Sequence, residues 1–394
     1  MASAVEPTFT VCSPNKSNFE GYVFIKAKLN SQITKDFALL PQLPKGFLLL
    51  SKPYLKFMQR KAYRLKAGNI NNLKLVTEDL PQPSEGEASV QFKAVGLNFA
   101  DVSVILGLYS ATPKGEFTPG LEYAGVVSAI GKNVTNVKVG DRVMGISRFG
   151  AYATHLNIDT RYLVPIPNDW SFEEGASYLV QVLTAYYALV PLGNLQPGMT
   201  VLIHSAAGGV GILANRIAKK MGAFTIGTVG STAKLNLLKE EGVDMPLVRD
   251  QEFYKNLDKI LETKQLNLIM ETQGGKMLME LFKRLAPEGR SIVYSAADFI
   301  THGNRPNYLK ILWKYLRRPM IDPMKLTDGN RGILGFNLIY LYEKIHLMHQ
   351  YLEEVKKLDI GKPRVGHILD FDNLPEAVRL LQSGKTTGKV VIKI

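Results

Sequence analysis

The stretch "HSAAGGVG", from His204 to Gly211, decides the fold because it joins two segments with different periodicities. The apolar run "TVLI" before it is typical of a buried strand, and "ILANRIAKKMGA" after it has the apolar spacing of an amphipathic helix. Further on, "FTIGTVG" precedes "STAKLNLLKEEGV", and "LNLIMETQG" precedes "KMLMELFKRLAPEG". Strands that alternate with helices at this spacing predict a doubly wound parallel sheet with helices on both faces.

The chain on the N-terminal side of this turn has a different pattern. From Met58 onward, six short β-rich pieces are separated by Gly, Pro and Asn, which predicts a compact β-barrel-like domain. "SFEEGASYLVQVLTAYYALV" has helical spacing behind a Ser171 cap, and "IYLYEKIHLMHQYLEEVKKL" predicts one long amphipathic helix. We expect the final run, "GKVVIKI", to return to the first domain. The fold class is therefore α/β, with one β-rich domain and one parallel-sheet domain.

Within the turn, Ser205, Gly208 and Gly211 form S-x-x-G-x-x-G, a variant of the dinucleotide fingerprint. A glycine at the start of a helix lets backbone N–H groups approach a pyrophosphate, whose charge the helix dipole favours. The last glycine permits close packing of the helix on the strand. Small residues also serve plain packing turns, but the strand before and the helix after favour dinucleotide binding.

The second strand indicates which dinucleotide binds. An NAD site usually has Asp or Glu about 20 residues after the turn. Here the stretch Gly227–Lys234, "GTVGSTAK", contains no acid. Ser231 and Lys234 offer a hydroxyl and a cation that suit a 2′-phosphate, although Lys234 has an alternative interpretation as a solvated helix residue. The missing acid is the stronger half of this argument, and it predicts NADPH.

The composition limits the classes of partner and site. A formal net charge of +13 favours anionic partners, namely phosphates, acidic lipid surfaces or nucleic acid. The chain lacks a recognised nucleic-acid-binding motif, so we expect no such partner. The single cysteine, Cys12, excludes an intramolecular disulfide and a thiolate-rich zinc site. No apolar run approaches the roughly 20 residues that cross a bilayer, and we expect a cytoplasmic protein.

Residues 1–57 differ from the rest, with seven lysines and no arginine. Three prolines, at 41, 44 and 53, interrupt any long element. We interpret this segment as a loosely ordered extension with one short strand at "GYVFIKA". Organelle targeting is the alternative, although transit peptides favour arginine and avoid acids.

A family resemblance rests on several ordered motifs. "VGLNFADV", "TPGLEYAGVVSAIG", "KVGDRVMG", "LQPGMTVLIHSAAGGVG" and "GKVVIKI" resemble the zinc-free medium-chain dehydrogenase/reductase superfamily, in its quinone oxidoreductase (zeta-crystallin) branch. "SAADFITHGNRPNYLKILWKYLRRPM" and "GILGFNLIYL" are similar to the vesicle amine transport protein type within that branch. The resemblance covers about residues 58–394.

This resemblance implies a GroES-like catalytic domain at 58–183 and 338–394, and a Rossmann NADPH-binding domain at 184–337. The cofactor would lie in the cleft between them. A homodimer is also implied, joined through the strand near "ILGFNLIY". The implied cofactor-binding residues are Thr184; Gly208, Gly209 and Val210 at the pyrophosphate; Ser231 and Lys234 at the 2′-phosphate; Arg249; and Gln273, Ser295 and Phe336 on the nicotinamide side. Relatives often have a tyrosine in place of Arg249, which either adds a second cation to the phosphate or points to solvent.

Zinc is where this chain departs from the wider superfamily. The zinc-dependent members use a cysteine near the "VGLNFAD" segment and a histidine in a G-H-E motif, whereas this chain has Gly120, Leu121 and Glu122 there. Leucine offers no lone pair, so we expect no catalytic metal and interpret Glu122 as structural. His346 and His349 are two positions on a helix face with no third ligand nearby.

Without a metal Lewis acid, the implied reaction is hydride transfer from NADPH to a quinone or to an α,β-unsaturated carbonyl. Asn98 and Tyr109 are the candidate catalytic residues, because both can donate a hydrogen bond to the developing oxyanion. In the alternative interpretations Asn98 caps a turn and Tyr109 is a packing residue. His204 is interpreted as a packing or hydrogen-bonding residue.

One basic segment, residues 305–319, bears on partners. It carries five cations, Trp313 and two tyrosines, and no acid. Such a segment can lie on an anionic membrane surface as a peripheral contact. We favour instead a helix that packs on the protein through Leu309, Leu312 and Leu316. The alternative function is a cofactor-binding membrane or vesicle adaptor with weak or no reductase activity.

Overall fold

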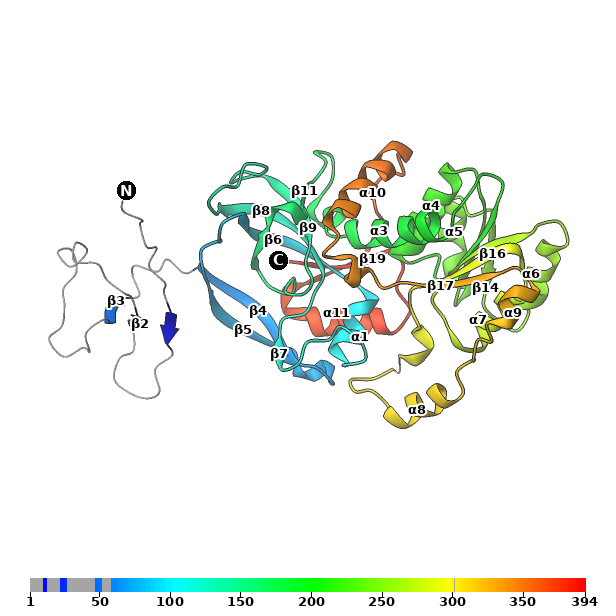
Figure 1. Cartoon of the computed structure of the whole chain (residues 1–394), viewed down its shortest axis with the longest axis horizontal. Coiled ribbons are helices and arrows are strands. Elements are labelled where there is room, and N and C mark those ends of the chain that lie inside the picture. Colours follow the sequence, from blue (N-terminus) through cyan, green and yellow to red (C-terminus); the bar gives the residue numbers. More distant parts are fainter. Residues whose placement is uncertain (1–9, 13–21, 27–46, 52–57, 301) are drawn as a thin grey trace, which may run out of the picture. The chain divides into compact units, whose positions relative to one another are not determined.

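The computed structural model describes residues 10–12, 22–26, 47–51, 58–300 and 302–394 (Figure 1). Within the predicted extension, β1 (Thr10–Cys12), β2 (Tyr22–Lys26) and β3 (Phe47–Ser51) form an antiparallel sheet, and β2 coincides with the expected strand. The rest of the extension lies outside the described residues. Residues up to Gln59, with Asp79–Gln82, form a unit separate from Arg60–Glu78 and Pro83–Ile394. The following paragraphs concern the larger unit.

The β-rich half is built on a seven-stranded sheet that uses both ends of this unit. Its order is β11-β9-β8-β6-β19-β18, with β10 paired to β6. The last strand, β19, lies antiparallel to β6 and pairs Val391 with Gly96, which confirms the expected return of "GKVVIKI". The strands are β6 (Glu87–Leu97), β8 (Glu122–Ile130), β9 (Arg142–Ile146), β10 (His155–Asp159), β11 (Leu163–Pro165), β18 (Val365–Asp370) and β19 (Lys389–Lys393).

A smaller sheet and several helices complete this half. Phe92 and Tyr123 stack with ring centroids 4.2 Å apart in its core. The smaller sheet contains β5 (Lys74–Leu80), β4 (Met58–Lys66) and β7 (Glu116–Phe117). The helices are η3 (Ile70–Asn72), α1 (Phe99–Ile105), η4 (Thr160–Tyr162), η9 (Phe371–Asn373) and α11 (Leu374–Gln382).

The second half is a six-stranded parallel sheet in the order β14-β13-β12-β15-β16-β17. Alternate residues of β12 enter different cores: Val201 and Ile203 pack in one core with α4, and Leu202 packs in another with α6 and α7. Since successive side chains of a strand point to opposite faces, helices cover both faces of the sheet. The predicted doubly wound arrangement is confirmed.

The strands of this sheet are β12 (Thr200–Ile203), β13 (Phe224–Val229), β14 (Met245–Val248), β15 (Leu266–Glu271), β16 (Leu285–Val293) and β17 (Gly332–Gly335). Its helices are α4 (Gly209–Lys220), η6 (Thr232–Lys234), α5 (Leu235–Glu240), α6 (Phe253–Leu261), α7 (Gly275–Phe282), η7 (Ala297–Phe299), α8 (Tyr308–Leu316) and α9 (Met324–Asp328). The domain limits given above stay a prediction.

The segment Phe172–Leu192 joins the two halves. Ser171 caps α2 (Phe172–Gly175), and its hydroxyl accepts from Glu174 N at 3.1 Å, as predicted. α3 (Leu179–Tyr187) and a π-helical turn, η5 (Ala188–Leu192), follow. By length and composition this 21-residue segment could cross a membrane, so the expectation that no run is long enough was wrong. Its most apolar window is 67% buried inside the protein, as expected of a core helix.

The predicted long helix near the C-terminus is two elements. η8 (Leu338–Leu341) ends before α10 (Ile345–Leu358) begins. The Tyr342 ring stacks on Tyr162 with centroids 4.2 Å apart, and the Tyr342 carbonyl accepts from the Tyr162 hydroxyl at 3.0 Å. These contacts hold Tyr342 against the β-rich half and interrupt the helix, which a periodicity argument could not reveal.

Candidate functional site

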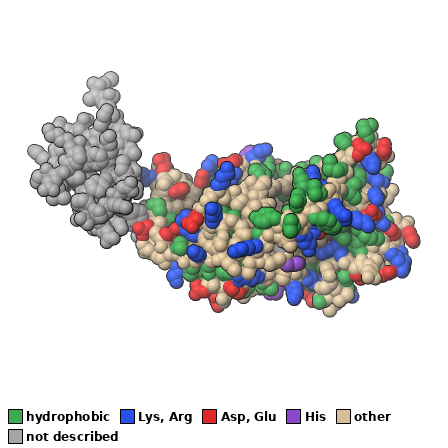
Figure 2. Space-filling view, turned by 90° about the horizontal axis from the view of Figure 1, so that it is seen from below, with side chains coloured by type: hydrophobic (Ala, Val, Ile, Leu, Met, Phe, Trp, Pro, Cys, Tyr) green, Lys and Arg blue, Asp and Glu red, His purple; other side chains and the backbone are tan. Residues whose placement is uncertain are grey.

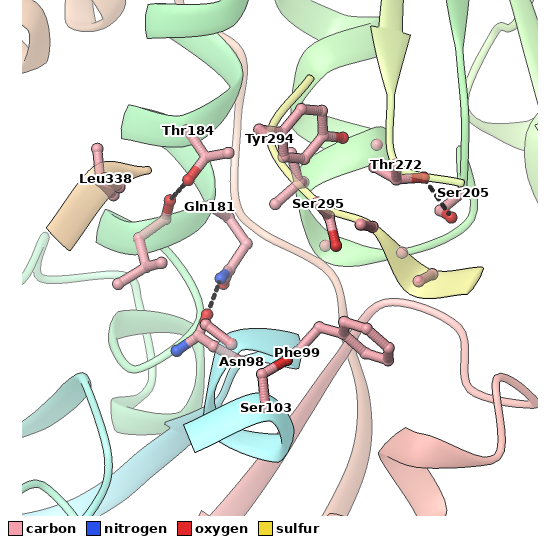
Figure 3. A pocket seen from close by; sticks show the side chains of 18 of the residues that line it. Asn98, Phe99, Ser103, Gln181, Thr184, Ser205, Thr272, Tyr294, Ser295 and Leu338 are labelled. Carbon is pink, nitrogen blue, oxygen red and sulfur yellow. Dashed lines mark hydrogen bonds between the residues drawn. The ribbon is translucent and has the colours of Figure 1, made fainter. Parts of the chain in front are cut away.

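A cleft of about 1350 Å³ lies between the two sheets, and Figure 3 shows part of its lining. Side chains from both halves line it, although they come from positions nearly 300 residues apart in the chain. Ser231 is exposed and is absent from the lining. The other predicted site residues all line the cleft: Asn98, Tyr109, Thr184, Gly208, Gly209, Val210, Lys234, Arg249, Gln273, Ser295 and Phe336.

The glycine turn brings the start of α4 to the cleft. Gly208 is the N-cap residue, and no side chain caps the helix. A β-carbon on Gly209 would lie 2.9 Å from Gln181 Cγ, and one on Gly211 would lie 2.5 Å from the Ser205 carbonyl oxygen. Gly209 therefore permits contact with α3, and Gly211 permits helix packing. An uncapped helix start that lines a cleft suits an anionic group.

Lys234 and Arg249 are two of the cations that line the same cleft. Lys234 Nζ donates to the carbonyls of Gly384 and Thr386, both at 2.7 Å, and Arg249 Nη1 donates to Thr228 Oγ1 at 3.0 Å. Burial and the Arg249 charge lower the pKa of Lys234. Among the described residues neither cation has a carboxylate partner within ion-pair distance. Two neighbouring cations without an acidic partner fit a phosphate.

A buried polar group, which we call the Lys389 cluster, contains Asn98, Glu122, Gln181 and Lys389. Lys389 Nζ donates to Glu122 Oε1 and, at 2.9 Å, to Asn98 Oδ1. Glu122 Oε1 also accepts from Asn98 Nδ2 at 3.0 Å and from Gln181 Nε2 at 3.2 Å. Gln181 Nε2 donates to Asn98 Oδ1 at 2.7 Å, a bond visible in Figure 3. The structural role expected for Glu122 is confirmed.

Lys389 and Gln181 were not singled out from the sequence. Lys389 is only 4% exposed, and burial lowers its pKa while the charge of Glu122 acts in the opposite direction. A β-carbon on Gly96 would lie 1.9 Å from the Ala176 carbonyl oxygen and 2.8 Å from Lys389 Cε, so this glycine makes room for both. The ion pair joins residues 267 positions apart, and a lysine before an apolar strand is too common a signal to reveal it.

Asp101 lies beside this cluster at the start of α1. Its Oδ2 accepts from Asn98 N at 2.8 Å and from the Tyr152 hydroxyl at 3.0 Å. Burial outweighs these bonds and raises the pKa of Asp101 to about 7. This carboxyl therefore titrates near neutral pH, although it does not line the cleft.

The two candidate catalytic residues already donate hydrogen bonds within the protein. Asn98 Nδ2 donates to Glu122, as described above, and the Tyr109 hydroxyl donates to Asn337 Oδ1. Burial raises the pKa of Tyr109 to about 12. Tyr109 thus links the loop after α1 to the chain after β17.

Four other predicted residues line the cleft, from α3, the chain after β15, the chain after β16 and the chain after β17. Gln273 follows β15 and donates through Nε2 to Thr272 Oγ1 at 3.1 Å. The Phe336 ring meets Tyr187 edge-on with centroids 5.0 Å apart. Ser295 extends into the cleft in Figure 3, and Thr184 donates to the Val180 carbonyl at 2.7 Å.

These residues do not fit a catalytic zinc. Leu121 lines the cleft without a lone pair, and the Glu122 oxygens accept from three side chains and from Val180 N. Within the described part of the chain no three His, Cys, Asp or Glu side chains gather to hold a metal. His349 Nε2 lies 2.9 Å from the Arg161 carbonyl.

Comparison with known proteins agrees with this architecture. Residues 84–168 match the family described as "Alcohol dehydrogenase GroES-like domain", and residues 209–353 match "Zinc-binding dehydrogenase". The rat protein "Synaptic vesicle membrane protein VAT-1 homolog" is 33% identical over 315 residues, which is 79% of this chain and 78% of the relative. The human protein of that name is also 33% identical, over 79% of this chain and 80% of the relative.

Solved structures show the same fold. The human synaptic vesicle membrane protein VAT-1 homolog-like protein is similar with a TM-score of 0.73 and 27% identity, over 86% of this chain and 98% of that one. The quinone oxidoreductase of Escherichia coli complexed with NADPH has a TM-score of 0.74 and 26% identity, over 86% and 100%. With its GroES-like and Rossmann halves, the chain belongs to the medium-chain dehydrogenase/reductase superfamily, as a member similar to the VAT-1 homologues.

Proposed function

We propose that this protein is a zinc-independent, NADPH-dependent oxidoreductase that transfers a hydride to a quinone or an α,β-unsaturated carbonyl acceptor. One observation carries the proposal: a single cleft is lined by an uncapped helix start, by Lys234 and Arg249, for which no carboxylate partner is found among the described residues, and by the buried ammonium of Lys389. The NADPH complexes of the Escherichia coli and Thermus thermophilus quinone oxidoreductases support it.

The residues present fit NADPH. The N–H groups at the start of α4 would hold the pyrophosphate, and Lys234 with Arg249 would hold the 2′-phosphate. Ser231, exposed beside η6, is the weakest member of the predicted set. When bound, the cofactor supplies the hydride, and the protein supplies orientation and electrostatics.

The Lys389 cluster suggests how the protein assists an acceptor. Among the described residues two acceptors are found for the three N–H bonds of Lys389 Nζ, and the lysine lines the cleft. A fixed ammonium in a dry site stabilises negative charge that develops on an acceptor oxygen. Asn98 then orients Lys389 by accepting from it, and Tyr109 holds the two halves together through Asn337.

The test is nucleotide titration followed by turnover with small quinones and enones. We expect NADPH to bind more tightly than NADH, and Lys234→Glu to weaken NADPH by at least about tenfold, or roughly 1.4 kcal/mol. Lys239→Glu, an exposed charge reversal on α5, is the matched control and should change little. Binding of neither nucleotide would refute the proposal, and NADPH binding without turnover would favour the second candidate function.

That second candidate is an adaptor on an anionic membrane. The favoured expectation, that residues 305–319 pack on the protein, was wrong. Leu309 is 82% exposed, Leu316 is 72% exposed, and α8 buries no residue. Met320 and Met324 continue the exposed apolar surface. Figure 2 views the molecule from the side on which α8 lies in Figure 1. Hydrophobic and basic side chains occur together on this face.

Flotation with phosphatidylserine-containing vesicles tests this surface. Lys314 pairs with Asp298 at 2.7 Å, whereas Arg317 and Arg318 lie over Trp313 and Tyr315 on α8 itself. We therefore choose Arg317→Glu with Arg318→Glu, and we expect this variant to lose flotation. The control, Lys220→Glu with Lys239→Glu, reverses two exposed charges elsewhere and should retain it. Equal flotation of both variants would exclude docking through α8.

The proposed assembly is a homodimer in the cytoplasm, with peripheral membrane contact through 305–319. β17 is the edge strand of the parallel sheet, so its outer side can pair with a second copy. Light scattering of the purified chain decides this point, because a monomeric mass at micromolar concentration would contradict it.

A further inference from the structure

Four side chains form a row across the carboxyl ends of neighbouring strands in the parallel sheet. Arg249 follows β14, Thr228 lies in β13, His204 follows β12, and Glu271 ends β15. The sheet order β14-β13-β12-β15 makes them consecutive. We call these four residues the strand-end row. Since neighbouring strands lie about 4.8 Å apart, its ends are separated by roughly 14 Å.

The hydrogen bonds at one end of the row indicate which groups donate and which accept. Arg249 Nη1 donates to Thr228 Oγ1 at 3.0 Å, and His204 Nδ1 lies 2.7 Å from the same oxygen. Thr228 Oγ1 accepts from Arg249, and His204 Nδ1 is the one acceptor found for the Thr228 hydroxyl in the described part of the chain. We therefore assign the hydroxyl as the donor to Nδ1. The proton of the neutral imidazole is then on Nε2, which faces Glu271.

The other end of the row holds a loop of the cleft. Glu271 Oε1 accepts from the N–H of Gln273 at 2.5 Å and of Gly274 at 2.9 Å. Gln273, Gly274 and Gly275 all line the cleft, as Arg249 does. Thr228, His204 and Glu271 have no exposed surface. The row therefore connects two separate parts of the cleft wall through the protein interior.

One contact in the row is incomplete. His204 Nε2 and Glu271 Oε2 lie 3.4 Å apart, beyond the usual 2.7–3.2 Å, and neither atom has another hydrogen-bond partner in the described part of the chain. Arg249 and Glu271 stand at the two ends of the row and are connected through Thr228 and His204. The gap can close if Arg249 is restrained.

We propose that His204 is a positioning residue: a phosphate bound at Arg249 tightens the His204–Glu271 contact, and Glu271 then holds the Gln273–Gly275 loop more firmly. The phosphate restrains the Arg249 guanidinium, and this restraint reaches Glu271 and the loop amides through Thr228 and His204. This inference rests on the proposed NADPH function. It implies that the 2′-phosphate influences the cleft at a distance as well as at its own binding site.

The experiment uses the full chain and two probes that lack nicotinamide, 2′,5′-ADP and 5′-AMP, at saturating concentration. The measurement is hydrogen exchange of the Gln273 and Gly274 amides. We expect 2′,5′-ADP to slow this exchange about fivefold and 5′-AMP to leave it unchanged. In His204→Phe and Thr228→Val, 2′,5′-ADP should still bind while the slowing is lost.

Thr225→Val is the matched control. Thr225 lies on the same strand, is also fully buried, and bonds to Asp244 at the opposite end of the strand. This variant should keep the slowing. Thr228→Val is nearly isosteric, so it decides the matter if His204→Phe does not fold.

The inference would be overturned if 2′,5′-ADP binds to the natural chain without slowing the exchange of these amides. It would also be overturned if the slowing persists in Thr228→Val. Either result would leave the NADPH proposal intact. Failure of 2′,5′-ADP to bind the natural chain would overturn both.

Discussion

The Lys389 cluster and the strand-end row are both buried polar groups beside one cleft, and they differ in how completely the carboxylate of each group is hydrogen-bonded. Every oxygen of Glu122 accepts hydrogen bonds, three of them from side chains of its own cluster. In the row, Glu271 Oε2 and His204 Nε2 remain 3.4 Å apart. A carboxylate with both oxygens hydrogen-bonded in a low-dielectric interior is fixed in one arrangement, whereas an incomplete contact leaves room for change. The first group therefore suits preorganisation and the second suits a response to ligand.

The largest expected effect comes from removing the cation of the Lys389 cluster. Lys389→Met leaves the Glu122 carboxylate buried without its charged partner and should lower the free energy of unfolding by about 3–5 kcal/mol. Urea denaturation measures this loss. Lys393→Met, an exposed lysine on the same strand, is the control and should stay within about 0.5 kcal/mol. A loss below about 1 kcal/mol for Lys389→Met would show that the cluster is not held by this ion pair.

Asp101, which lies beside the Lys389 cluster, should make the stability of the protein depend on pH. Its pKa rises from the ordinary 3.8 to about 7 on burial, so between these values the folded state holds a proton that the unfolded state has released. The free energy of unfolding should fall as pH rises through this range, by at most roughly 4 kcal/mol.

Thermal unfolding from about pH 5 to 8 measures this effect. Asp101→Asn should remove the slope, since an amide oxygen still accepts from Asn98 N and Tyr152. An identical slope in this variant would assign the pH dependence to another group.

A smaller loss of stability is expected where the glycine turn contacts the Lys389 cluster. A methyl group at Gly209 would lie 2.9 Å from Gln181 Cγ, whereas at Gly208 the nearest atom is the Ser205 carbonyl oxygen at 3.3 Å. Gly209→Ala should cost about 1–3 kcal/mol through overpacking, and Gly208→Ala should cost less. Differential scanning calorimetry compares the two. The reverse order would mean that Gln181 can move freely, although its Nε2 donates to Asn98 and Glu122.

The smallest effect is expected in the strand-end row. Thr228→Val removes a hydroxyl that bonds Arg249 and His204, and it should cost only about 1 kcal/mol because the row is already incomplete. The same urea titration applies, with Thr225→Val measured alongside. A loss as large as that of Lys389→Met would erase the contrast between the two groups.

Local patterns predicted the fold well. The alternation around His204–Gly211 identified the parallel sheet, and Ser171 with Glu174 formed the expected helix cap. Both follow from contacts between residues close in sequence, where periodicity and capping rules apply directly. The prediction of one long helix near the C-terminus was wrong, because the stacking of Tyr342 on Tyr162 is a contact between segments that are distant in sequence.

The basic helix shows another limit of sequence patterns. Leu309, Leu312 and Leu316 have the spacing of a buried face, yet all three are exposed. Helical spacing shows which residues share a face but not whether another element covers it. Whether another element covers this helix face depends on the path of the neighbouring segments in the tertiary structure.

The sequence by itself determined the alternation of strands and helices around the glycine turn, the missing acid after the second strand and the leucine in place of a zinc ligand. Each of these depends on residue chemistry at fixed short spacing. Only the tertiary structure decided that Lys389 meets Glu122, that Arg249, Thr228, His204 and Glu271 align, and that Ser231 stays outside the cleft. Those contacts join residues from separate strands, and strand order, which no local pattern encodes, sets which side chains become neighbours.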